Sequence, residues 1–498
     1  MRSVLLLLLV PSVAWAQDDR ESEMFGVETS STATVAGEEP LLIAPPIIAA
    51  PASIDASRDI LAIGGLIFLQ LDTGLADYGA ITVPGSAEGL KTTLASPSFF
   101  DVYLDARPND RLRAYMRGRV GFDASAVGGT KSVFGQVVEP FTPQLEQAWI
   151  KLDVLRSLFV TVGREKVKFG VGRFWNPTDF VNRERLDALA GVTVFDRRPG
   201  VGLVKLHFPI ESLGWNFYAI GTLDGAKSLD EPGAVLRAEL LLGTTEIAIS
   251  GAARKDNPQR VGLAVSTGIG WVDLKAEAAV AFNSKELFLR GSCNVAQAFT
   301  AIVPGATALP DSLGEAYERS DEALPQIVAG AEIGIPIGDE DTLYFGGEYF
   351  YNGTGYEDAT YYPCLIARPV LAGQLGMTGK QPTFSPFYLG QHYVGGYAFI
   401  QSPGRWDDTA FFLSGLANLS DQTGVVRFDF RQVWLTYLSF NAYVTTHLGT
   451  GGGEYAFSFR LPPSVMIPQP LPAGAADLLR DGVPRAVLEA GVGLQVAF

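Results

Sequence analysis

A row of arginines spaced two residues apart is the feature of this chain that most directly indicates chemistry. Arg111, Arg113, Arg117 and Arg119 share one face of an alternating segment with Tyr115, while apolar residues and glycine occupy the other face. Successive side chains of a β-strand point to opposite faces, so this pattern places the guanidinium groups side by side. Such a row can steer anions through a pore.

The segment before this row supplies acidic partners. Asp101 and Asp105 share one face of residues 98–106. Two interpretations are open: a basic wall that selects anions, or ion pairs that hold the strand register and select nothing. Basic residues outnumber acidic ones between residues 98 and 210, although the whole chain has a net charge of −16, and this segregation favours the first. The same inner surface is expected to carry Lys205, Arg427, Asp429 and Arg431.

Catalytic groups are sparse. The chain has 3 histidines, and the expected strand order brings no serine, histidine and acid together. No HxxxH-type metal spacing and no glycine-rich phosphate loop occurs in the sequence, so we expect no enzyme activity, no metal and no cofactor. His207, His392 and His447 are expected at the rims of a barrel. The acidic net charge argues against a nucleic-acid partner.

The element that would position these side chains is the membrane-spanning β-strand. Residues 488–498 alternate strictly and end on Phe498. At about 3.3 Å per residue and a tilt of roughly 40°, such a strand spans the ~25 Å apolar band of an outer-membrane barrel. The terminal strand of a soluble sandwich is the alternative for this segment alone. We expect Phe498 to carry the signal for the barrel-assembly machinery.

The same alternation recurs along the chain and predicts an all-β, transmembrane, up-and-down antiparallel β-barrel of about 18 strands, or 16 if no turn lies near 432–435. The expected strands are 58–72, 98–106, 111–123, 144–153, 157–168, 200–208, 213–223, 233–242, 245–254, 260–270, 272–283, 325–336, 341–352, 391–400, 408–418, 423–432, 434–447 and 485–498. Short and long connections alternate, which predicts short periplasmic turns and long extracellular loops. A barrel of this width leaves a water-filled channel, and therefore favours transport over catalysis.

The N-terminus has the features of an export signal. Arg2 precedes an apolar run, Pro11 interrupts it, and the small residues at 14 and 16 fit signal peptidase cleavage. We therefore expect a signal peptide over 1–16, a flexible acidic periplasmic segment over 17–57 and a barrel over 58–498, in contact with the lipid of a Gram-negative outer membrane. Residues 41–51 are apolar and either stay within the flexible segment or plug the lumen.

The two cysteines fall in neighbouring long loops. Cys293 lies in 284–324 and Cys364 in 353–390. Both loops should emerge side by side on the outer face, where an oxidising envelope favours a disulfide. Two unpaired thiols are the alternative.

Residues 163–179 (GREKVKFGVGRFWNPTD) form the most specific internal motif. Glycines at 170 and 172 permit a bend, and residues 176–179 form a turn, so the loop can fold inward and narrow the pore. An outward surface loop is the alternative. The residues expected to border the constriction are Arg173, Trp175, Asn176, Asp179, Arg183 and Arg185.

This motif resembles a stretch of Gram-negative porin-like outer-membrane proteins, in which GRQ leads into WGxGxxWNPTD. Glu165 stands in place of Gln and Phe169 in place of Trp. Alginate-export-like barrels and related porin-like families are the nearest resemblance. It implies an outer-membrane channel.

These patterns together predict an outer-membrane channel that passes polar or anionic solutes by diffusion. Export of an exopolysaccharide is a more specific hypothesis. The alternatives are a lipid-modifying or proteolytic barrel enzyme, and an adhesion or assembly barrel that binds a partner through its extracellular loops. The direction of transport, the solute and the oligomeric state stay open.

Overall fold

The computed structural model describes residues 60–77, 79, 89–126, 140–154, 156–182, 200–226, 228, 231–301, 308–337, 341–377, 379–382, 384–459 and 482–498. The expected signal peptide and acidic N-terminal segment lie outside the described residues, as do Arg183 and Arg185.

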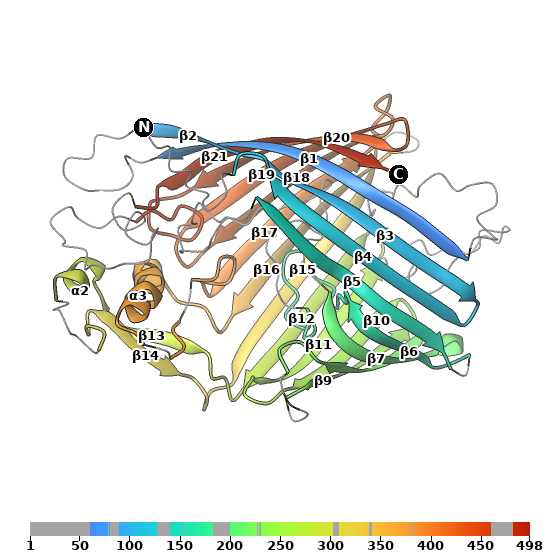
Figure 1. Ribbon diagram of the computed structural model, residues 1–498, viewed down its shortest axis with the longest axis horizontal. Helices are drawn as coiled ribbons and strands as arrows, with labels where there is room; N and C mark the ends of the chain where they lie inside the picture. Colours follow the sequence, from blue (N-terminus) through green and yellow to red (C-terminus); the bar gives the residue numbers. More distant parts are fainter. Residues whose placement is uncertain are drawn as a thin grey trace.

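A single antiparallel sheet closes on itself to form a barrel of 18 spanning strands (Figure 1). Each spanning strand pairs with the next one along the chain, and the last pairs with the first. The spanning strands are β1 (Leu61–Asp77), β3 (Pro97–Asn109), β4 (Leu112–Asp123), β5 (Phe141–Asp153), β6 (Phe159–Glu165), β7 (Val201–Ile210), β8 (Trp215–Thr222), β9 (Gly233–Leu242), β10 (Thr245–Ala253), β11 (Gln259–Ile269), β12 (Val272–Phe282), β15 (Leu324–Ile337), β16 (Asp341–Asn352), β17 (His392–Gln401), β18 (Thr409–Asn418), β19 (Thr423–Trp434), β20 (Leu438–Leu448) and β21 (Arg485–Ala497). The predicted barrel and its strand order are confirmed.

Two details differ from the sequence-based expectation. The first long connection is shorter than 73–97, because β1 continues to Asp77 and pairs there with β2 (Leu90–Ala95). The alternative of 16 strands is wrong, because a turn does separate β19 from β20. Leu435 and Thr436 adopt positive φ angles of 54° and 61° in that turn. Non-glycine residues seldom adopt this conformation, which is why the composition gave no turn signal.

The two faces of the wall differ in polarity. In β4, the outward side chains of Met116 and Val120 are 49% and 37% exposed, whereas the inward Arg119 is 5% exposed. Three exposed tryptophans, Trp271, Trp406 and Trp434, lie at or beside the short turns of one end. An apolar exterior with aromatic residues at its edge is the surface that a lipid bilayer requires.

A small cap occupies the opposite end, which carries the long loops (Figure 1). It consists of the hairpin β13 (Leu287–Cys293) and β14 (Leu313–Glu318), with α2 (Val295–Ala301), η3 (Ala359–Tyr361) and α3 (Tyr362–Gln374). These elements share one apolar cluster that includes Leu289, Leu313 and Leu365. No helix in the described part of the chain is long and apolar enough to cross a membrane.

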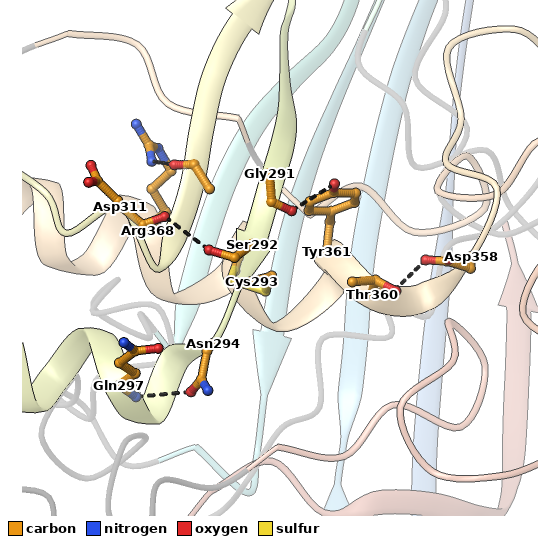
Figure 2. The surroundings of a disulfide bond; sticks show 12 residues. Gly291, Ser292, Cys293, Asn294, Gln297, Asp311, Asp358, Thr360, Tyr361 and Arg368 are labelled. Atoms are coloured by element: carbon orange, nitrogen blue, oxygen red, sulfur yellow. Dashed lines mark hydrogen bonds between the residues drawn. A yellow bond between two sulfur atoms is a disulfide. The ribbon is translucent and has the colours of Figure 1, made fainter.

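The predicted disulfide is confirmed and joins the two parts of this cap. Cys293 at the end of β13 is bonded to Cys364 in α3, across a sequence separation of 71 residues (Figure 2). Tyr361 donates a hydrogen bond of 3.1 Å to the Gly291 carbonyl beside it. The bridge therefore ties the loop after β12 to the loop after β16.

The barrel closes at Phe498. Its backbone exchanges hydrogen bonds of 2.8 and 3.0 Å with Gly65, and its ring stacks on Phe100 with centroids 6.1 Å apart. A Cβ atom at position 65 would collide with the Phe498 ring. The terminal ring therefore covers the first strand at the seam.

We predict that Phe498→Asp reduces the amount of closed barrel, because it removes the stacked aromatic ring at the seam and places a carboxylate on the lipid-facing surface, which itself costs up to about 1 kcal/mol near the interface. Phe498→Tyr, which keeps the ring, is the control and should fold normally. The measurement is the fraction of heat-modifiable protein on a gel of outer-membrane extracts. A wild-type fraction for Phe498→Asp would show that the terminal ring is dispensable.

Candidate functional site

The segment Lys166–Asn182, here called the inner loop, leaves β6 and folds into the barrel. Gly170 has a φ of 104°, and a Cβ at Gly172 would collide with the Trp175 carbonyl. The amide of Asp179 donates to the Asn176 carbonyl at 3.1 Å, and the Asp179 carboxylate accepts from the amide of Asn182 at 3.1 Å. Glycine thus permits the bend, and the turn reverses the chain inside the lumen.

Glu277 of β12 holds the two ends of this bend. Its Oε1 atom accepts the amides of Val171 and Gly172 at 2.5 and 2.8 Å. Its Oε2 atom accepts the amide and the hydroxyl of Thr178 at 3.1 and 2.7 Å. One ionised carboxylate has enough acceptor capacity for all four donors.

Glu348 of β16 holds the tip. It accepts the amides of Arg173 and Phe174, the latter at 2.8 Å. The Arg173 guanidinium lies over the rings of Tyr397 and Phe412, 4.4 and 4.5 Å from their centroids.

Aromatic packing fixes the tip further. The Trp175 ring stacks on Phe350 at 5.2 Å and lies 5.7 Å from Tyr393. Trp175 is 1% exposed and Tyr393 is fully buried. Charge-assisted hydrogen bonds and stacking together hold the tip in one place.

The inner loop therefore crosses the lumen. Strands β7 to β12 and β15 lie between β6, where the loop begins, and β16, which holds its tip. Near its origin the loop packs against the adjacent wall, where Phe169 contacts Tyr218 and lies under the Arg237 guanidinium at 4.6 Å. The outward surface loop, which the sequence left open, is not what these residues form.

The arginine row faces the lumen, but each inward arginine has an acidic partner. Asp101 accepts from Arg119 at 2.7 Å and from Arg117 at 2.6 Å. Asp105 accepts from Arg113 at 2.9 Å. A guanidinium paired in this way exerts a weaker field on a passing ion than a free one.

A second acid extends this network towards the inner loop. Glu146, which is fully buried in β5, lies 3.5 Å from Arg119 and 2.5 Å from the Lys166 ammonium. The pairing of β4 with β5 shifts its register at this residue. The bulge turns an additional carboxylate inward.

Of the other residues that were expected to line the lumen, some form ion pairs and others do not. Arg111 lies in the turn before β4 and is exposed, so it does not continue the inward row. Lys205 pairs with Glu165 at 2.6 Å. Asp429 is fully buried and pairs with Arg427 at 2.8 Å, while Arg431 is 4% exposed. Tyr115 stacks between Tyr103 and Trp149.

The histidines make contacts of a structural kind. His207 lies 2.9 Å from the Asn216 amide oxygen, His392 lies 2.7 Å from the Tyr349 hydroxyl, and His447 lies 2.8 Å from the Tyr455 carbonyl. No serine hydroxyl is among the hydrogen-bond partners of these rings in the described residues. Among the described residues, no three or more His, Cys, Asp or Glu side chains lie close enough together to hold a metal ion.

A carboxyl cluster ties the loop after β20 to the mouth. Glu454 accepts from the Tyr393 hydroxyl at 2.7 Å and from the Asn418 amide at 2.8 Å. Asp421 accepts from the backbone amide of Glu454 at 2.7 Å. Burial raises the pKa of the Glu454 carboxyl to about 8, and the nearby Asp421 adds to this shift.

No protein-family model matches the chain, and no curated protein matches it. Solved structures of similar chain path include OccAB1 of Acinetobacter baumannii, with 10% identity, 88% of this chain and 96% of that chain covered, and a TM-score of 0.48. OccK9 (OpdG) of Pseudomonas aeruginosa has 9% identity, coverages of 88% and 98%, and a TM-score of 0.47. The outer membrane protein OpdK of the same organism has 8% identity, coverages of 88% and 99%, and a TM-score of 0.44. Such similarity carries no argument about solute or mechanism.

Sequence reasoning missed the role of Glu277 and Glu348. Both carboxylates fall on the inward face of their strands. The residues next to them in the sequence form no motif that would indicate a partner about 100 or more residues away. The only usable signal was an acidic side chain on the inner face of a strand with no basic residue opposite.

We predict opposite effects of the two members of one ion pair. Arg117→Ser should shift the zero-current potential in a salt gradient towards cations, and Asp101→Asn should shift it towards anions. The double variant should return close to the wild-type value, because it removes one charge of each sign. Planar-bilayer recordings measure all three. Identical potentials for all variants would mean that the row does not border the ion path.

We also predict a pH-dependent loop. The Glu454 carboxyl ionises near pH 4.5 in an unfolded loop but only near pH 8 in the folded loop. Its contribution to the stability of the folded loop is therefore fully present below pH 4.5 and is lost as the pH rises to about 8. Each pH unit weakens the closed loop by up to about 1.4 kcal/mol. Hydrogen exchange at Ala456 and Phe457, corrected for intrinsic rates, measures this. Glu454→Gln should flatten the profile, whereas the exposed Glu357→Gln should not; an unchanged profile in Glu454→Gln would assign the effect elsewhere.

Proposed function

We propose that this protein is an outer-membrane channel that passes polar solutes by diffusion through a lumen narrowed by the inner loop. The observation that carries the proposal is the loop itself, which starts at β6 and is held by carboxylates of β12 and β16 on the far side of the barrel. A barrel of 18 strands would otherwise enclose a wide aqueous channel. A loop fixed across this channel reduces the width of the channel without closing it.

The outer membrane is the proposed location, with its lipid around the apolar exterior and the barrel-assembly machinery as the partner that inserts it. The outward Met116 and Val120 and the exposed Trp271 support this location, because these side chains suit hydrocarbon and its interface. A signal peptide over residues 1–16 belongs to the same proposal.

The solute class is proposed to be polar and to include anions. The lumen-facing Arg113, Arg117 and Arg119 support the passage of anions. Their ion pairs with Asp101 and Asp105 weaken the attraction that these arginines exert on an anion. Export of an exopolysaccharide is the narrower form of the proposal and rests on the resemblance of the motif at residues 163–179. A barrel enzyme is the less supported alternative, because none of the described histidine contacts forms a nucleophile-activating pair.

The test is the conductance of the refolded protein in a planar bilayer, with and without the loop contacts. Glu277→Gln and Glu348→Gln each replace an acceptor-only group with one that also donates, and a charge-assisted hydrogen bond contributes about 1.5–3 kcal/mol. We predict that the double variant has a larger and noisier single-channel conductance than the wild type. Glu315→Gln, which alters an exposed ion pair of the cap, is the matched control and should change nothing.

Two results would contradict the proposal. Absence of any conductance from correctly folded wild-type protein would rule out a channel. A wild-type conductance in the folded double variant would show that the inner loop does not limit the flow.

A further inference from the structure

A partly open cavity lies between the tip of the inner loop and the cap. This cavity has a volume of about 720 Å³, within the range of small-molecule sites. Its lining comes from the inner loop, the turn between β10 and β11, the start of β13, the start of β15, the end of β16 with the residues that follow it, α3, and residues 380–382 and 385–389.

Aromatic rings and amides form much of the lining. The rings belong to Trp175, Phe288, Phe350, Tyr356, Phe387 and Tyr388. The amides belong to Asn176, Asn257, Gln326 and Gln381. A pyranose ring has apolar C–H faces that pack on aromatic rings and hydroxyl edges that need both donors and acceptors, which planar amides supply.

Trp175 and Asn176 of the inner loop contribute to the lining, but their polar atoms are closed off from the cavity. Trp175 Nε1, Asn176 Nδ2 and Asn176 Oδ1 are buried and have no hydrogen-bond partner among the described residues. Trp175 itself is 1% exposed. Hydrogen bonds to a ligand therefore come from polar groups that are open to the cavity, such as the exposed side-chain amide of Asn257.

The charges of the lining balance. Lys285 pairs with Asp256 at 2.6 Å, and Glu286 lies 3.7 Å from Arg260. Lys380 is exposed at the edge of the cavity and interacts with Asp256 as well. A strongly anionic ligand would meet two carboxylates here, and a cationic one would meet the ammonium groups.

We propose that this cavity is a binding site for a neutral mono- or disaccharide, which it captures before passage along the lumen. This proposal rests on the channel function proposed above and names one solute class for it. Aromatic side chains of the lining pack against the sugar ring, and lining amides such as that of Asn257 hydrogen-bond its hydroxyl groups. The site therefore concentrates a neutral sugar at the mouth, independently of the paired charges farther down.

The direct test is calorimetry on the detergent-purified full chain, titrated with cellobiose, maltose and, as the anionic probe, digalacturonate. We expect saturable binding of a neutral sugar and at least tenfold weaker binding of digalacturonate. Ser385→Trp, at an exposed residue of the lining, should fill the cavity and reduce neutral-sugar affinity at least tenfold. Gln297→Trp, an exposed position on α2 outside the lining, is the matched control and should bind normally.

A second variant guards against misfolding of the first. Asn257 is exposed, and its side-chain amide donates to the Lys255 carbonyl at 3.1 Å, so Asn257→Ala should fold and still weaken binding. Binding that is absent in the wild type, unaffected in both folded lining variants, or stronger for digalacturonate would overturn the proposal. Ohmic conductance in plain salt is recorded in parallel. If the protein conducts ions but binds no sugar, the binding site is refuted and the channel is not. If the protein binds sugar but does not conduct, the channel is refuted and the binding site is not.

Discussion

The acceptance of inner-loop amides by Glu277 and Glu348 is the interaction on which the interior of this protein depends. A loop that leaves a barrel wall carries backbone N–H groups with no strand to pair with. Water would satisfy them in an open pore, but water does not fix a position. Two ionised carboxylates on the far wall satisfy six donors of the loop and also define where it lies.

The placement of these two carboxylates inside the barrel constrains the rest of the lumen. Carboxylates cannot be brought into a protein interior without compensation, and amides together with the Arg173 guanidinium supply it. The opposite wall follows the same rule with Asp101 and Glu146, which the arginines of β4 and Lys166 neutralise. Lys166 is the first residue of the inner loop, so the ion network of one wall and the carboxylates of the other hold the two parts of a single segment. Each of these four carboxylates therefore has a basic or amide partner among the described residues.

The architecture was predictable because it depends on local periodicity. Alternation along each strand gave the pairing order and the inward direction of Arg117 and Arg119, and the positions of Cys293 and Cys364 in neighbouring loops gave the disulfide. Two kinds of feature were beyond sequence reasoning. The turn at Leu435 and Thr436 uses residues that seldom adopt positive φ, and the partners of the inner loop come from strands that only the closed barrel brings together. Periodicity gives the face on which a residue lies, but not which loop reaches it.

The cap, the cavity and the inner loop form one mechanical unit because they share residues. Tyr393 contacts the Trp175 ring and donates its hydroxyl to Glu454, which belongs to the loop after β20. Phe350 stacks on Trp175 and also lines the cavity. A solute in the cavity therefore lies beside Trp175 and Phe350, two of the side chains that hold the loop tip. If the loop limits flow, binding at the mouth and passage through the lumen are coupled through Trp175, since one indole ring serves as the floor of the cavity and as the anchor of the constriction.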